Sequence, residues 1–98
     1  MSYSLHRGAE QDLAEAFRFY RREGGTGLAR RFLGEFERVM KLLEAFPDIG
    51  MPTGEDRRRS CPLTGFPYSV IYRHANAEIR VLVVRHQHRD PEHGEHRS

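Results

Sequence analysis

Two runs of alternating residues within residues 66–86 predict a β-hairpin. Apolar side chains recur at every second position, which is the period of a β-strand. Asn76 in the connecting turn tolerates a left-handed backbone, and the turn type stays open. Because aliphatic residues occupy both faces of the second run, we expect a central strand of a small sheet that helices cover on one side. In the first run the residues of one face are Phe66, Tyr68, Val70 and Tyr72. In the second run Ile79, Val81 and Val83 alternate with Arg80, Leu82 and Val84.

A helical period of three to four residues precedes this hairpin. Apolar stripes predict one helix up to Tyr20 and a second that Pro47 ends, with a glycine-rich connector at residues 24–27. Residues 2–6 alternate like a short strand, and residues 58–63 suggest a further strand that Pro62 either confines to a sheet edge or interrupts. The expected fold is α+β: a short N-terminal strand, an antiparallel two-helix hairpin, then a mainly antiparallel sheet of three to four strands.

Composition narrows the class of protein. The chain has 98 residues, the size of a single domain, and we expect one domain over residues 1–98 with a polar tail at about 87–98. Sixteen basic residues against 14 acidic ones leave a net charge of +2, and Lys41 is the one lysine. Arginine suits phosphate and carboxylate partners, so an acidic partner is compatible with the chain but not required. With a single cysteine, Cys61, and neither a signal peptide nor a long apolar run, we expect a cytoplasmic protein without membrane association.

The order of these elements resembles the ParE/RelE superfamily of small bacterial toxins from type II toxin–antitoxin modules, over nearly the whole chain. The most specific part is the Phe-Pro-Tyr strand, followed by the valine-rich strand and the His, Arg and Pro after it. The residues that carry the resemblance are Ala9, residues 12–20, Phe32, Pro47, Gly50, Pro52, residues 65–73, residues 81–84, His86, Arg89 and Pro91.

The resemblance implies a toxin held inactive by a small antitoxin. ParE-like members act on DNA gyrase, whereas RelE-like members cut mRNA on the ribosome. Such nucleases commonly carry an arginine where this chain has Ser69, another near Gln87, and a tyrosine near His93. These departures favour a ParE-like toxin that inhibits gyrase by binding, without a cofactor, and forms a hetero-oligomer with a ParD-like antitoxin. A RelE-like mRNA endoribonuclease is the first alternative, and a weakened toxin-like repressor or interaction module is the second.

Three sets of candidate site residues follow. For the nuclease alternative, the candidates for acid–base and charge-stabilising roles are His86, Arg89 and His93. The predicted target-binding residues are Arg57, Arg58, Arg59, Arg73, Arg85 and Arg97. The predicted antitoxin-binding groove on the second helix is lined by Leu28, Phe36, Met40 and Leu43. The tail histidines match no closed metal-site spacing, so no metal is expected. Tyr68 and Tyr72 are expected to pack at strand spacing, and Cys61 to act as a small hydrophobe.

Overall fold

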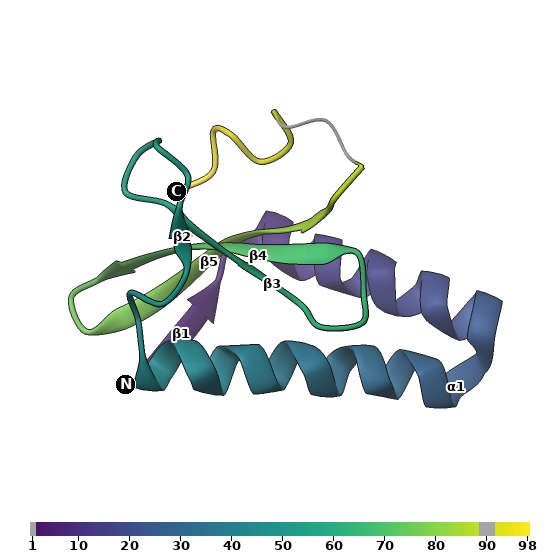
Figure 1. Cartoon of the computed structure of the whole chain (residues 1–98). Coiled ribbons are helices and arrows are strands. Elements are labelled where there is room, and N and C mark those ends of the chain that lie inside the picture. Colours follow the sequence, from purple (N-terminus) through teal and green to yellow (C-terminus); the bar gives the residue numbers. More distant parts are fainter. Residues whose placement is uncertain (1, 89–91) are drawn as a thin grey trace.

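A computed structural model describes residues 2–88 and 92–98 of the chain (Figure 1). A short strand leads into one long bent helix, and four further strands follow. The helix lies on one side of the sheet, and the C-terminal segment lies on the other (Figure 1). The elements are β1 (Ser2–Leu5), α1 (Arg7–Ala45), β2 (Met51–Pro52), β3 (Arg59–Pro62), β4 (Tyr68–Ala75) and β5 (Glu78–His86).

The helix α1 replaces the predicted pair of separate helices. Its start is capped by His6, whose Nδ1 accepts a hydrogen bond from the backbone N of Gly8 at 2.9 Å. The backbone is non-helical at Gly25, with φ 86° and ψ 176°, a conformation that glycine adopts at low cost. The two halves of α1 meet at this bend and run back antiparallel (Figure 1). The predicted four-residue connector is therefore reduced to one bent position. Within the described part of the chain, no helix has a stretch long and apolar enough to cross a bilayer.

The sheet has five strands in the order β1-β5-β4-β3-β2, which corrects the predicted three to four. It is also mixed, because β1 pairs in parallel with β5 while the other pairs are antiparallel. The hairpin of β4 and β5 is confirmed, and β5 lies inside the sheet between β1 and β4. The central position itself belongs to β4.

A β-bulge changes which residues of β5 face the helix. Ile71 pairs with Val83, but the next residue, Tyr72, pairs with Val81, so Leu82 is an extra residue in β5. Strict alternation would place Val83 with Val81, and this expectation is wrong. Val84 instead joins the main core under α1, while Ile71, Leu82 and Val83 form a second apolar cluster. Because Ile71 alternates with its neighbours along β4, this cluster lies on the opposite face of the sheet.

The main core lies between α1 and the sheet. Aromatic rings close it toward the bend of α1, where Tyr20 packs on Phe32 with ring centroids 5.2 Å apart. At the other end the buried Tyr72 hydroxyl donates to the carbonyl of Pro47 at 2.7 Å and accepts from the N–H of Gly50 at 3.0 Å. The fully buried contributors include Ala9, Phe32, Val39, Leu43, Val70, Tyr72, Ile79 and Val81.

Candidate functional site

The C-terminal segment, residues 92–98, packs on the sheet face that α1 leaves open (Figure 1). Gly94 adopts φ +80°, and a Cβ added there would stand 2.3 Å from Cγ2 of Val83. A contact this close requires glycine, because any side chain would collide with the strand. The segment therefore sits directly on the second apolar cluster. It belongs to the packed fold, although its composition resembles that of a solvated tail.

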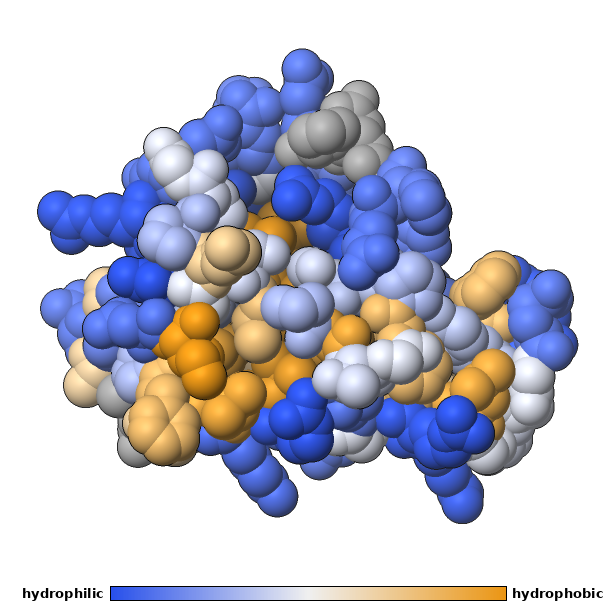
Figure 2. All heavy atoms as spheres, in the orientation of Figure 1, coloured by the Kyte–Doolittle hydropathy of each residue, from blue (hydrophilic) through white to orange (hydrophobic). Residues whose placement is uncertain are grey.

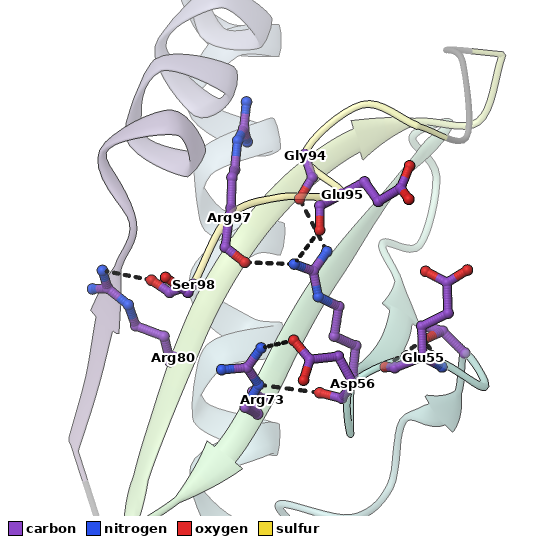
Figure 3. Close-up of polar contacts among 10 residues, drawn as sticks. Glu55, Asp56, Arg73, Arg80, Gly94, Glu95, Arg97 and Ser98 are labelled. Atoms are coloured by element: carbon purple, nitrogen blue, oxygen red, sulfur yellow. Dashed lines mark hydrogen bonds and ion pairs between the residues drawn. The ribbon is translucent and has the colours of Figure 1, made fainter.

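Arg58 holds this segment in place by hydrogen bonds to its backbone. Its side chain is buried, with 7% of the residue exposed, and it donates to the carbonyls of Gly94 at 3.0 Å and Glu95 at 2.8 Å. A further bond reaches the carbonyl of Arg97, and Figure 3 shows all three carbonyl oxygens turned toward the same guanidinium. Hydrogen bonds from a charged donor are among the stronger ones in proteins. Arg58, predicted as a target-binding residue, thus holds the chain's own backbone.

A second attachment lies at the edge of β5. The strand β1 pairs with β5 only as far as Val81, so beyond that residue β5 is paired with β4 on one side and has no strand on the side of β1. Asp12 of α1 accepts a hydrogen bond from the N–H of Val84 at 3.1 Å, and Arg97 donates to the carbonyl of Leu82 at 3.2 Å. The carboxylate of Asp12 also binds Nη1 of Arg97 at 2.6 Å and Nε2 of His93 at 2.9 Å.

Asp12 is the structural residue that sequence reasoning missed. Its place in the first turns of a helix suggests an acid that simply favours the helix dipole, yet only 9% of the residue is exposed. Its spacing held a usable signal, because Asp12 lies three residues after Ala9 and four before Ala16, both buried. An acid in line with the apolar stripe of a helix faces the core and requires a partner there.

The other predicted target-binding arginines remain at the surface. Arg59 donates to the carbonyls of Asp48 at 3.1 Å and Gly50 at 2.8 Å. Arg73 forms an ion pair with Asp56 (Figure 3), and the Asp56 side chain is largely exposed. Arg57 is exposed on the turn before β3, and Arg85 is half-buried on β5. Arg58 and Arg97 are therefore used inside the fold, whereas the other four predicted arginines face solvent in part or fully.

The catalytic candidates are not gathered into one arrangement. His86 packs edge-on against Tyr68 with ring centroids 5.0 Å apart, and it lines a shallow pocket that also contains Asp12 and Glu15. His93 belongs to the segment on the opposite face of the sheet, and Asp12 binds its Nε2. Arg89 lies outside the described residues. No group of three potential metal ligands comes together among the residues that the structure describes.

The predicted antitoxin groove is largely core. Phe36, Met40 and Leu43 are at most 4% exposed and face the sheet, while Leu28 is half-buried near the bend. An apolar groove lies instead on the outer side of α1, between its two packed halves. Its lining residues are Leu5, Leu13, Ala14, Phe17 and Leu33, with Glu10 and Arg18 among them.

Burial also defines the chemistry of Cys61. Desolvation raises the pKa of this thiol, with a nearby arginine, Arg38, acting in the opposite direction. A raised pKa leaves little thiolate, the reactive form, at neutral pH. Cys61 is therefore a packing residue of β3.

Comparisons with known proteins agree with this architecture. The family model described as the ParE toxin of the type II toxin–antitoxin system parDE matches residues 3–91. Among solved structures, the one described as "Chromosomal ParDE TA system from P. aeruginosa" is 25% identical, with a TM-score of 0.77. The match covers 88% of this chain and 95% of that one. No curated protein matches the sequence. Because the family model spans nearly the whole chain, this protein belongs to the ParE toxin family of type II toxin–antitoxin systems.

Proposed function

We propose that this ParE-type toxin inhibits DNA gyrase by binding it, and that a cognate antitoxin neutralises the toxin. Membership of the ParE family supports the toxin class, and the similar solved structure is described as a ParDE system. The observation that carries the binding mode is the use of His93 and Arg97 within the fold, where both are held by the buried Asp12.

An acid–base mechanism requires groups that can exchange protons with a substrate. Nε2 of His93 meets a carboxylate oxygen 2.9 Å away and lies close to Arg97, so this one of its two ring nitrogens is used within the fold. Arg58 is likewise committed to three backbone carbonyls. A toxin that acts by contact alone needs only a complementary surface, and its cationic part would be Arg57, Arg59, Arg73 and Arg85.

The direct test is a supercoiling assay with purified gyrase and the full chain. We expect loss of supercoiling, restored by adding the antitoxin in excess. R57Q/R73Q should weaken inhibition about tenfold, which corresponds to about 1.4 kcal/mol of binding. K41Q removes an exposed positive charge from the far half of α1 and serves as the control.

The same preparation separates the alternatives. Uninhibited gyrase combined with mRNA cleavage on ribosomes would replace this proposal with the RelE-like nuclease, and H86A would then abolish cleavage. Absence of both activities, with antitoxin binding retained, would identify an interaction module instead.

For the antitoxin we propose an amphipathic helix laid in the outer groove of α1. The groove is lined by Leu13, Phe17 and Leu33, and helix-in-groove binding uses apolar anchors of this kind. F17S should weaken antitoxin binding in calorimetry by about tenfold or more. F46S is the matched control, since Phe46 is 60% exposed near the last turn of α1, away from the groove. Equal loss in both variants, or loss only in F46S, would exclude this groove.

A further inference from the structure

The bend of α1 concentrates the positive charge of the molecule. Residues 18–31 contain five arginines and one acid, Glu23, so this segment carries +4 while the whole chain carries +2. The remaining residues therefore carry a net −2. We call this segment the helical tip. In the orientation of Figure 1, Figure 2 shows hydrophilic side chains around the bend, interspersed with apolar ones. The five arginines are Arg18, Arg21, Arg22, Arg30 and Arg31, and all are exposed.

The arginines of the tip make only weak contacts within the fold, such as the stacking of Arg21 on Phe17 at 5.8 Å. Among the described residues, the guanidinium groups of Arg18, Arg30 and Arg31 have no carboxylate partner within ion-pair distance. Arg22 lies 3.9 Å from Glu23, with both side chains more than half exposed, and a pair of this kind contributes little. This differs from the sheet side, where Arg58 and Arg97 are fixed by the chain itself. The positive charge of the tip arginines is therefore available to an external partner.

The tip presents its charges in two rows. Arg18, Arg21 and Arg22 are spaced i, i+3 and i+4, which places them on one face of the first half of α1. Arg30 and Arg31 lie on the second half. The contact between Tyr20 and Phe32 holds the halves together near the bend. Packed helices have axes about 8–10 Å apart, so the two rows are close enough to contact one nucleic-acid duplex together.

We propose that the helical tip binds double-stranded DNA, with both arginine rows contacting its phosphate backbone. Arginine forms paired hydrogen bonds with phosphate, and the binding would be independent of base sequence. A protein partner is less well matched, because the tip offers little apolar surface to form the core of a protein interface. At the tip the one large exposed apolar side chain is Phe19, 44% exposed, with Arg22 stacked on its ring at 5.9 Å. This proposal does not depend on gyrase being the target.

The test is fluorescence anisotropy with the full chain and a labelled mixed-sequence DNA duplex over a series of NaCl concentrations. The logarithm of affinity should fall with the logarithm of salt, by about 0.9 for each phosphate contacted. R30Q/R31Q should reduce this slope by about 2 and weaken binding at low salt. The matched control R7Q/K41Q removes the same charge from exposed positions at the opposite ends of the two halves and should leave the slope unchanged.

Two further arms decide the ligand. A single-stranded RNA that binds more tightly than the duplex would overturn the assignment to duplex DNA. Competition by polyglutamate at the same charge concentration as DNA would show an unspecific anion surface, also against the proposal. Equal loss in R30Q/R31Q and R7Q/K41Q would mean that net charge, not the tip, governs binding. Circular dichroism confirms that each variant is folded before its slope is interpreted.

Discussion

Asp12 and Arg97, 85 positions apart in the chain, form an ion pair of 2.6 Å that joins α1 to the C-terminal segment across the edge of β5. Both side chains are mostly buried, with 8% and 18% exposed. Each also binds a backbone group of β5 beyond the end of its pairing with β1. The ion pair therefore satisfies backbone groups of β5 beyond the end of β1 and also holds the C-terminal segment on the sheet.

Replacing Asp12 by Asn should destabilise the protein by about 3 kcal/mol, because it leaves Arg97 buried without a counter-charge. Urea unfolding at pH 7 measures the change. E37Q, at an exposed position of the same helix, should alter stability by less than about 0.5 kcal/mol. In a double-mutant cycle with R97Q, the two losses should not add, since both variants break one interaction. Additive losses would mean that Asp12 and Arg97 act separately.

Replacing Arg58 by Met should release residues 92–98 from the sheet while the core stays intact. Three bonds from one guanidinium to backbone carbonyls are lost, and bonds from charged donors contribute about 1.5–3 kcal/mol each. Hydrogen exchange of this segment should accelerate by about tenfold or more, because local opening becomes easier. R57M, the change at the exposed neighbour, should leave exchange as it is. Unchanged protection in R58M would contradict the role of Arg58 as the fastening residue.

Periodicity predicted the elements whose burial is regular. The alternation in β4 and in β5 up to the bulge, and the stripe around Phe32, follow from facing the main core between α1 and the sheet, so local pattern and tertiary structure agree there. The pattern failed at Leu82, because a bulge depends on pairing between two strands and leaves no local mark in either. It failed also at Gly25, where four neighbouring polar and glycine positions suggested a loop but one residue makes the bend.

The candidate site was harder to predict for a different reason. An arginine has the same local signature whether it faces solvent or binds carbonyls from residues 94–97. The roles of Arg58 and Arg97 come from contacts 36 to 85 positions apart, which no short-range pattern contains. Phe36, Met40 and Leu43 were placed on the correct stripe of the helix, but a stripe alone does not tell a core from a groove.

Replacing Tyr72 by Phe should cost about 1–3 kcal/mol, because it leaves the buried N–H of Gly50 without its partner. The carbonyl of Pro47 also loses a donor at 2.7 Å. Both groups lie in the loop between α1 and β2, so this loop should exchange faster with solvent. Y3F is the control, since Tyr3 is 40% exposed on the edge strand β1. A neutral Y72F would show that water replaces the hydroxyl.

Glu35 should make the stability of the protein sensitive to acid. Its carboxylate accepts two bonds of 2.7 Å from Arg38 and one of 2.6 Å from the N–H of Thr64. The bonds from Arg38, foremost, lower the pKa of Glu35 below its usual value, although partial burial acts in the opposite direction. A lowered pKa in the folded state means that folding favours the charged carboxylate. This stabilisation is fully present above the unfolded pKa, about 4.3, and is lost as pH falls through the folded pKa.

E35Q keeps the shape of the side chain but cannot ionise, so its deficit relative to the parent should be largest at neutral pH and should shrink below about pH 4. Urea midpoints of both proteins at pH 7, 5 and 3.5 give the comparison. The exposed E37Q provides the background, because its difference from the parent should not change over this range. A deficit of E35Q that stays constant down to pH 3.5 would assign the contribution of Glu35 to hydrogen-bond geometry instead of charge. The expected narrowing would show that α1 is joined to the turn at Thr64 by an ionised contact.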